Sequence, residues 1–236
     1  GVIDITNKQN IITGYTCDYK DIVIPEQITA IMGNTVGTTF TEKELTSVDF
    51  SKAKNLTIIG YGTFQSNKIN SIDLSKATKL ETIGSEAFSE NEITDLKLPN
   101  NIEGIGRRAF MKNKITNVDF SKLTNLTEMA VGVFKNNEIT DADLSNMKNL
   151  TIISTDSFYN NRLANITIPN SVTSIEISAF ENNQLTSVTI PNSVTKIMGG
   201  AFSKNPNLTS IKIDKEENSI EGSPWGASDA TITWLR

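Results

Sequence analysis

Residues 185–205 read LTSVTIPNSVTKIMGGAFSKN, and this stretch contains the whole of a pattern that repeats along the chain. Its apolar positions are Leu185, Val188, Ile190, Val194, Ile197 and Phe202. The residues around Val188 alternate between apolar and polar, as in a strand with one buried face. A second apolar pair, Val194 and Ile197, comes after Pro191, and the phenylalanine follows five residues later. The pattern therefore predicts a short strand, a corner, a second buried segment and a tight turn.

A phenylalanine recurs at the same place in each copy of this pattern. The positions are Phe40, Phe64, Phe88, Phe110, Phe134, Phe158, Phe180 and Phe202, with successive gaps of 24, 24, 22, 24, 24, 22 and 22 residues. A fixed period of this size is typical of a solenoid, in which each repeat buries its apolar face against its neighbours only. We therefore predict one continuous array in which the phenylalanines stack as a buried ladder.

The length of the repeat varies only at the corner after the first strand. Four residues separate the strand from the second apolar pair where the chain leaves through Pro99, Pro169 or Pro191, and six where it leaves through serine, as after Phe50. Proline ends a strand because it cannot donate a ladder hydrogen bond. The stretch before each phenylalanine often contains glycine or alanine. We predict a short helical or 3₁₀ turn there, in which the small residue allows close packing.

An asparagine follows each phenylalanine of the array by three residues. These are Asn67, Asn91, Asn113, Asn137, Asn161, Asn183 and Asn205. A row of amides can bind a ligand, or it can satisfy backbone groups of the turns as a buried structural ladder; we favour the ladder. Ala142 and Met129 replace larger or branched residues of the core pattern, so we expect any local opening to start between residues 115 and 162.

The pattern breaks at both ends, where a solenoid must cover its terminal apolar faces. We predict an N-terminal cap with an irregular first repeat in residues 1–44, the array in 45–213, and a C-terminal cap in 214–236. Trp225 and Trp234 fall in the last segment, either closing the core or exposed to stack on a sugar. Cys17, the only cysteine, is interpreted as a small structural side chain rather than a reactive thiol.

The motifs Ile-Pro-Asn-Ser-Val-Thr-x-Ile and Ala-Phe-x-x-Asn resemble the BspA-type bacterial leucine-rich repeat, most closely over residues 163–205. The resemblance covers nearly the whole chain. It implies a β-rich α/β solenoid: a right-handed leucine-rich repeat array with a parallel, concave β-sheet and short helical or 3₁₀ turns. It also implies a secreted or cell-surface protein, often one involved in adhesion, and it supplies no catalytic residues.

The composition argues against several functions. With no histidine and one cysteine, the chain lacks the side chains of Ser-His-Asp triads, Cys-His pairs and thiolate metal clusters. A net charge of −5 argues against nucleic acid as a partner. No apolar run approaches the roughly 18 residues that span a bilayer, so we expect no membrane insertion of this segment. We predict a non-enzymatic protein, without cofactor or metal, that is a monomer.

Carboxylates on the outward side of the first strands are the remaining candidates for function. They are Asp49, Asp73, Asp95, Asp119, Asp141 and Asp143. Strands about 4.8 Å apart would place Asp49 beside Asp73, and Asp119 beside Asp143. Such pairs can serve a glycosidase, bind Ca²⁺, or form a solvated acidic face, and we favour the acidic face. The C-terminal half of the same row, including Thr167 and Thr189, is uncharged.

These observations support two functional hypotheses. The first is an extracellular binding module, of the adhesin type, that recognises a protein or glycan ligand, possibly a basic one, through the concave face. The second is a structural spacer that presents another domain at the cell surface. Both place the chain outside the cell, with a secretion signal that is not in this sequence.

Overall fold

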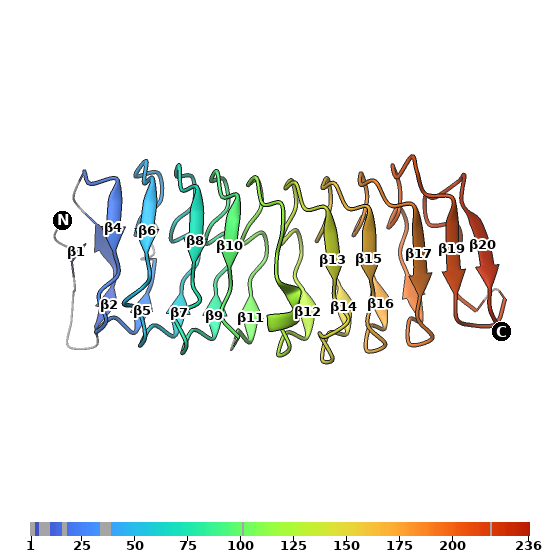
Figure 1. The fold of residues 1–236 in the computed structure, drawn as a ribbon, viewed down its shortest axis with the longest axis horizontal. Coiled ribbons are helices and arrows are strands. Elements are labelled where there is room, and N and C mark those ends of the chain that lie inside the picture. Colours follow the sequence, from blue (N-terminus) through green and yellow to red (C-terminus); the bar gives the residue numbers. More distant parts are fainter. Residues whose placement is uncertain (1–2, 5–9, 16–17, 34–38, 101, 218) are drawn as a thin grey trace.

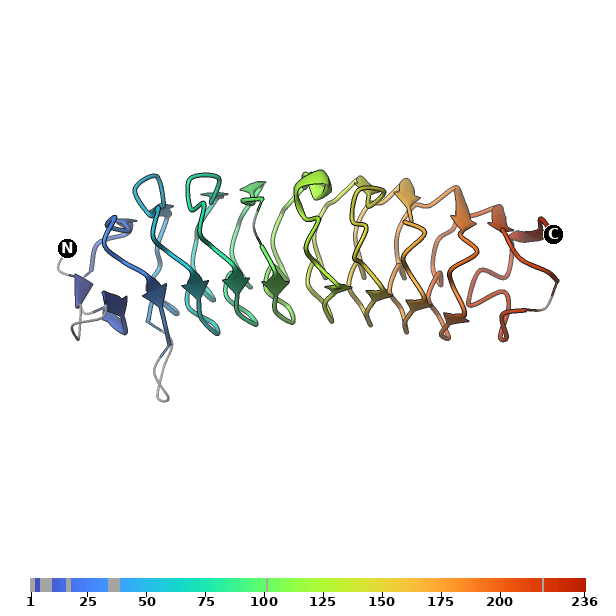
Figure 2. The ribbon, with the colours of Figure 1, turned by 90° about the horizontal axis from the view of Figure 1, so that it is seen from below.

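The computed structural model describes residues 3–4, 10–15, 18–33, 39–100, 102–217 and 219–236. The chain winds into an elongated solenoid with its termini at opposite ends (Figure 1). Two rows of short parallel strands run along the array and the hydrophobic core lies between them. Figure 2, turned by 90°, shows each coil as a narrow loop stacked on the next. The predicted parallel-strand solenoid is therefore confirmed.

The first strand of each coil forms one row, here called the first-strand face. Its members are β4 (Asp21–Val23), β6 (Ser47–Asp49), β8 (Ser71–Asp73), β10 (Asp95–Lys97), β13 (Asp141–Asp143), β15 (Asn165–Thr167), β17 (Ser187–Ile190), β19 (Ser210–Ile213) and β20 (Thr231–Trp234). The middle residue of nearly every three-residue strand is buried and its two neighbours are exposed, as the alternation predicts. The row is paired in patches, which are β4–β6, β8–β10, β13–β15 and β17–β19–β20.

The second apolar pair of each coil forms a second row of two-residue strands. They are β2 (Ile11–Ile12), β5 (Ala30–Ile31), β7 (Ile58–Ile59), β9 (Thr82–Ile83), β11 (Gly104–Ile105), β12 (Glu128–Met129), β14 (Ile152–Ile153), β16 (Ser174–Ile175) and β18 (Lys196–Ile197). Pairing is continuous from β2 to β11 and again from β12 to β18. Within this row, β11 and β12 are the neighbouring strands that do not pair, and we call this interval the sheet gap.

The third side of each coil carries the repeat phenylalanine and the asparagine three residues later, and we call it the phenylalanine edge. The eight rings are fully buried and stack with centroids 5.0–5.8 Å apart. Backbone bonds of 2.8–3.1 Å join every coil to the next here, from the Phe40 N–H donating to Thr63 through the Phe202 N–H donating to Trp225. This edge is therefore uninterrupted where both strand rows have breaks.

The asparagines link the phenylalanine edge from coil to coil. In Asn137, Nδ2 donates to the carbonyls of Phe110 (2.9 Å) and Phe134 (3.1 Å), and Oδ1 accepts from the Ile115 N–H (3.1 Å). Asn67, Asn91, Asn113, Asn161, Asn183 and Asn205 make the equivalent bonds. Each amide thus satisfies the phenylalanine carbonyls of its own coil and of the preceding one, together with the N–H at the start of its own coil, which accounts for a polar group inside the apolar frame.

The turns before the seven phenylalanines from Phe64 to Phe202 are not helical. In the Gly84–Ser89 turn, Ala87 N–H donates to Gly84 and Ser89 N–H to Glu86, while Glu86 has a φ of 58°. A residue in the left-handed region ends a 3₁₀ helix, so consecutive β-turns form instead. Among the described residues the one 3₁₀ helix is η1 (Phe120–Lys122). The predicted helical turns are therefore a minor feature.

Both ends of the core are covered by aromatic rings. At the N-terminal end, β1 (Ile3–Asp4) pairs antiparallel with β3 (Gly14–Tyr15), and the Tyr15 ring lies 5.0 Å from that of Phe40. At the other end, Trp225 is buried and its Nε1 donates to Glu221 O (2.7 Å). Trp234, at the end of β20, is half-buried against the core. Cys17 lies outside the described residues.

Candidate binding face

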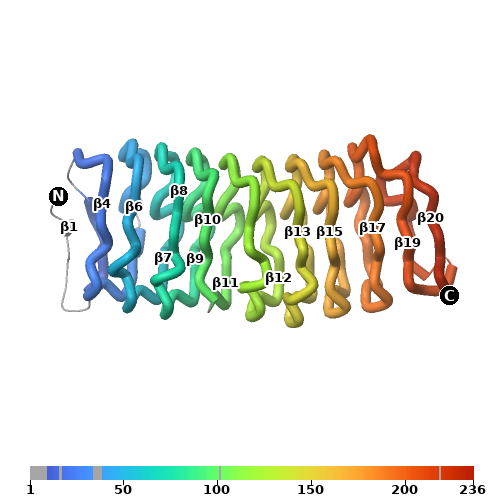
Figure 3. The backbone as a smooth tube through the Cα atoms, in the orientation of Figure 1, coloured from blue at the N-terminus to red at the C-terminus, as the bar shows by residue number. Residues whose placement is uncertain are grey.

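The outward side chains of the first-strand face lie in register across each paired patch. Asp141 is opposite Asn165, and Asp143 is opposite Thr167. The six predicted aspartates, Asp49, Asp73, Asp95, Asp119, Asp141 and Asp143, are all exposed. Figure 3 shows β6, β8, β10 and β13, which carry all of them except Asp119, following one another along the array. The face therefore displays a continuous set of polar groups to the solvent.

Four of the aspartates cap the longer corner of their coil. Oδ1 of Asp49 accepts from the Ser51 N–H (2.7 Å), that of Asp73 from Ser75 (2.9 Å) and that of Asp143 from Ser145 (3.0 Å). Asp119 bonds Ser121 in the same way. An aspartate that bonds the N–H two residues later stabilises a turn. One oxygen of each carboxylate is thus engaged in the corner; the second oxygen of Asp73 also lies 3.4 Å from Lys97 Nζ.

Asp119 departs from the row that the sequence predicts. It is the N-cap of η1, and the following Phe120 turns inward, with its ring edge-on to the rings of Phe134 (5.8 Å) and Phe158 (5.9 Å). The first strand of this coil is reduced to a single bridge between Asp95 and Asn117. Asp49 and Asp73 lie on β6 and β8, which do not form a paired ladder. The strand ladder that would hold neighbouring carboxylates in register is therefore missing at both places.

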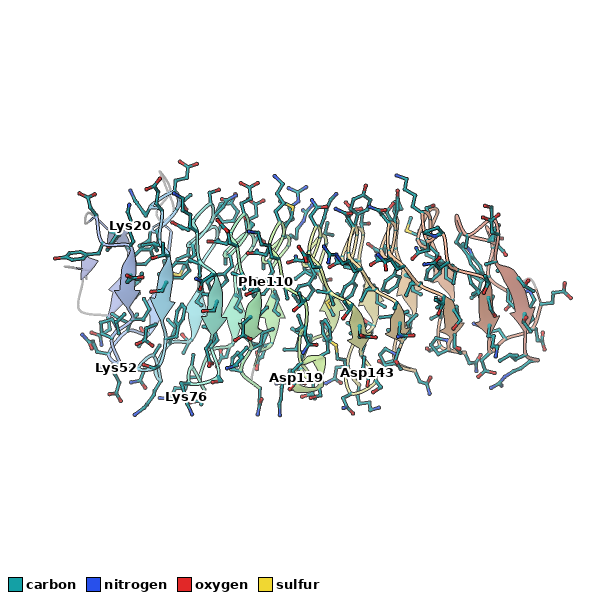
Figure 4. All side chains as sticks on the ribbon, turned by 45° about the horizontal axis from the view of Figure 1, so that its top comes forward. Lys20, Lys52, Lys76, Phe110, Asp119 and Asp143 are labelled. Atoms are coloured by element: carbon teal, nitrogen blue, oxygen red, sulfur yellow. The ribbon has the colours of Figure 1, made fainter. Side chains whose placement is uncertain are left out.

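Cations and hydrogen-bond donors accompany the carboxylates. Lys97 Nζ lies 3.4 Å from Asp73 Oδ2, and Asn165 Nδ2 donates to Asp141 Oδ1 (3.0 Å). In Figure 4, Lys52, Lys76, Asp119 and Asp143 lie along the same margin of the array. The acidic part of the face is therefore an alternation of both charges rather than a uniform negative strip.

Two of these carboxyl groups have a lowered pKa. For Asp73, the main cause is the side-chain hydrogen bond from Ser75, with a smaller contribution from Lys97. For Asp143, the cause is hydrogen bonding from the backbone and side chain of Ser145. Both groups therefore carry their charge at neutral pH, because the corner stabilises the ionised form.

A groove crosses the face where β15 and β17 fail to pair. Its volume is about 410 Å³, and its polar lining comes from Asn165, Thr167, Asn170, Ser187, Thr189 and Asp214. Ile166, the middle residue of β15, is only partly buried here. The C-terminal part of the face thus presents hydroxyl and amide groups around a depression.

The described residues contain no group of three or more histidine, cysteine, aspartate or glutamate side chains arranged to hold a metal ion. Within those residues, no helix is long and apolar enough to cross a membrane. The face offers exposed hydrogen-bonding groups, among them the carboxylates of Asp49 and Asp143 and the hydroxyls of Thr167 and Thr189.

The corner role of aspartate has a signal in the sequence. Each of the four caps begins Asp-x-Ser, as in Asp49-Phe50-Ser51, and each occurs in a long corner. The short corners at Pro99, Pro169 and Pro191 have lysine or threonine at the equivalent position. The aspartate thus varies with the corner type, which shows that it serves the fold as well as the surface.

The strand rows, the stacked phenylalanines and the asparagine bonds define a leucine-rich repeat solenoid. A family model described as "BspA type Leucine rich repeat region" matches residues 14–140 and 127–226, with six copies. These matches cover most of the chain, which belongs to the BspA-type leucine-rich repeat family. The resemblance inferred from the sequence motifs is confirmed.

Two solved structures share this fold. A leucine-rich repeat protein from Bacteroides ovatus is 20% identical, with a TM-score of 0.61 over 91% of this chain and 55% of that one. A leucine-rich cell surface protein from Faecalibacterium prausnitzii is 24% identical, with a TM-score of 0.53 over 89% of this chain and 52% of that one. The chain thus spans about half the length of these proteins. No curated protein matches it.

Proposed function

We propose that this chain is a non-catalytic binding module of a bacterial cell-surface protein, and that its first-strand face recognises a protein or glycan ligand. The observation that carries this proposal is the face itself: exposed polar side chains in register across β13–β15 and β17–β19–β20, with a groove between the two patches. Ligand sites combine a depression with a few polar groups that fix orientation.

The two parts of the face suit different chemistry. The free oxygens of Asp49 and Asp143, together with the exposed carboxylates of Asp73, Asp95 and Asp141, attract a basic surface and make binding sensitive to salt. The groove at Thr167 and Thr189 is uncharged apart from Asp214, whose carboxylate is held by Arg236 at 2.8 Å. Small hydroxyl and amide groups there can exchange hydrogen bonds with a peptide backbone or with sugar hydroxyls.

The surface location rests on family membership and on the structural relative that is named a cell surface protein. An adhesin-type role follows from that location together with the binding face. Proteins of this repeat type typically bind or scaffold rather than catalyse. The exposed polar side chains of the first-strand face suit such a role.

A spacer role is the second candidate, and one observation favours it. Four of the six aspartates on the face are engaged in corner caps, so the stability of the coil alone accounts for their presence. In that case the face would be only a solvated surface. A wall anchor and a separate adhesive domain encoded in the same gene would support the spacer.

The proposal is tested by screening this chain against immobilised extracellular-matrix proteins and a glycan array. The double variant Asp73→Asn, Asp143→Asn removes two charges while keeping an oxygen that can cap the corner. Glu42→Gln, Asp229→Asn removes two exposed charges elsewhere and is the matched control. We expect the first variant to weaken binding of a basic ligand at low salt and the control to leave it unchanged. Equal binding by both would contradict the role of the face.

A further inference from the structure

The sheet gap is the place where the second row of strands opens. Elsewhere in this row, two hydrogen bonds flank the paired strands at each junction, as in Thr151 N–H to Thr127 O (2.8 Å) and Ser154 N–H to Met129 O (2.9 Å) between β12 and β14. The equivalent groups across the gap are the N–H groups of Thr127 and Ala130 and the carbonyls of Glu103 and Ile105. β11 and β12 lie farther apart than paired neighbours in the row.

A change in packing occurs at the gap. Gly60, Gly84 and Gly106 occupy the position four residues before the phenylalanine in three successive coils. A Cβ on Gly106 would lie 2.3 Å from Ser85 N, and one on Gly84 would lie 2.6 Å from Gly60 C. Ala130 has a Cβ at this position, so its coil cannot approach Gly106 in the same way.

The gap leaves four main-chain groups without a protein partner. Among the described residues, no hydrogen bond joins the N–H of Thr127 or Ala130 to any group, and none reaches the carbonyl of Glu103 or Ile105. Two donors on one strand therefore face two acceptors on the other. Unpaired groups on an exposed strand edge are a template for pairing with an added strand.

A groove of about 380 Å³ lies along the gap. Its lining includes Gly84, Gly104, Gly106, Ile105, Thr127 and Glu128, together with Glu103. The glycines leave main chain accessible where other coils have side chains. Glu103 and Glu128 are exposed, and within the described chain neither forms an ion pair. The groove thus combines unpaired backbone groups with two free carboxylates.

We propose that this groove binds an extended, basic peptide segment, which adds as a strand at the sheet gap. The carbonyls of the segment accept hydrogen bonds from Thr127 and Ala130, and its N–H groups donate to Glu103 and Ile105. Lysine or arginine side chains of the segment lie beside the carboxylates of Glu103 and Glu128. This site is on the opposite strand row from the first-strand face and is independent of the function proposed for that face.

The first experiment measures binding of a fluorescent peptide, acetyl-Lys-Thr-Val-Thr-Val-Thr-Lys-amide, by anisotropy. Gly104→Leu is the blocking variant, because a Cβ at Gly104 meets nothing within 4 Å and the longer side chain enters the groove. Gly199→Leu is the matched control, since a Cβ there is equally free and lies far along the array. We expect Gly104→Leu to weaken binding at least tenfold and Gly199→Leu to leave it unchanged.

Two further comparisons identify the contacts. The same peptide with its alternate amides N-methylated keeps its charge and loses main-chain donors, so it should bind at least tenfold more weakly. Glu103→Gln, Glu128→Gln should weaken binding of the unmodified peptide, and the loss should shrink as salt is raised. No binding by the unaltered chain, or equal binding by Gly104→Leu or by the N-methylated peptide, would overturn the proposal.

Amide hydrogen exchange provides a readout that does not depend on affinity. In the free protein, the amides of Thr127 and Ala130 should exchange faster than those of Thr151 and Ser154, which occupy the same positions one coil later and are hydrogen-bonded. Peptide should slow the first pair and leave the second unchanged. Slow exchange of Thr127 and Ala130 without peptide would mean that β11 and β12 pair with each other, and the proposal would be wrong.

Discussion

The coils before the sheet gap and the coils after it differ in the residue that packs against the neighbouring coil. In residues 45–114, glycine at the fourth position before phenylalanine brings neighbouring backbones into contact, and the ring centroids from Phe40 to Phe110 lie 5.0, 5.2 and 5.6 Å apart. In residues 115–213 this position has alanine, serine, glutamate or methionine, and the centroids lie 5.7–5.8 Å apart. The two blocks meet at β11 and β12, where the strands no longer pair.

The difference shows that strand pairing is not what makes the array continuous. Both rows of strands are interrupted, whereas the phenylalanine edge joins every coil across the gap through the Phe110 N–H bond to Val133 and the bonds of Asn137. Cooperativity between repeats depends on such interfaces between neighbours. The coupling of the two blocks is therefore expected to depend mainly on this edge.

The largest effect is expected from Phe134→Ala, in the first coil after the gap. The ring is fully buried between those of Phe110 and Phe158, and its removal leaves a cavity on the edge that joins the blocks. We expect a loss of about 3–5 kcal/mol in the free energy of unfolding, measured by urea denaturation. Phe64→Ala, inside the first block, should cost a similar amount. A much smaller loss for Phe134→Ala would mean that the edge does not dominate at the junction.

Gly106→Ala tests the close packing of the first block directly. The new Cβ would meet the backbone of Ser85 at 2.3 Å, and backbone cannot move aside as a side chain can. We expect a destabilisation of about 1–3 kcal/mol, measured as a lower denaturation midpoint. Gly104→Ala, two residues away, has free space and should change stability by less than about 0.5 kcal/mol. Equal effects of the two variants would contradict the role of glycine in this block.

Asn137→Ala removes an amide that spans the junction of the two blocks. It leaves the carbonyls of Phe110 and Phe134 and the Ile115 N–H without this partner, at a cost of about 1–3 kcal/mol. Asn183→Ala removes the same bonds within the second block and should cost a similar amount. The two should differ in cooperativity: calorimetry of Asn137→Ala should show two transitions, and that of Asn183→Ala one. A single unshifted transition for Asn137→Ala would refute this.

Much of this architecture could be predicted from the period of the phenylalanines. The period identifies the buried positions, and the small residue before phenylalanine predicts close packing, which Gly84 and Gly106 confirm. The sheet gap depends on the offset between adjacent coils. The gap falls where glycine at the fourth position before phenylalanine gives way to Ala130, but the later coils, with Ser154, Glu176 and Met198 at that position, do pair, so this residue alone does not account for the offset. The expected opening between residues 115 and 162 remains a prediction; the gap lies at its N-terminal border.

For the aspartates of the first-strand face, the sequence contained a structural signal that the strand pattern alone does not reveal. The alternation of apolar and polar residues correctly predicts that Asp73 and Asp143 are exposed. It gives no sign that they also have a structural role, so from the sequence alone they are interpreted only as candidate binding residues. Their caps join residues two apart around a corner, at the point where strand alternation ends. The Asp-x-Ser motif at long corners contained this information. Whether the free oxygens bind a partner is a separate question, which the proposed binding screen addresses.

The smallest effect expected is the pH dependence of the long corners. The pKa values of Asp73 and Asp143 are lowered in the folded protein by the bonds from Ser75 and Ser145. A carboxyl group whose pKa is lower in the folded state stabilises the fold above its unfolded pKa, about 3.9, and loses that contribution as the pH falls through the folded value. Because both groups are exposed, each should contribute less than about 1 kcal/mol. Unfolding free energies measured at pH 6 and at acid pH should therefore differ less for Asp143→Asn than for the unaltered chain.

The short corners at Pro169 and Pro191 have threonine in place of this aspartate, so Thr167→Val should leave the pH dependence unchanged. An Asp143→Asn variant with the full acid sensitivity of the parent would show that this cap does not stabilise the corner.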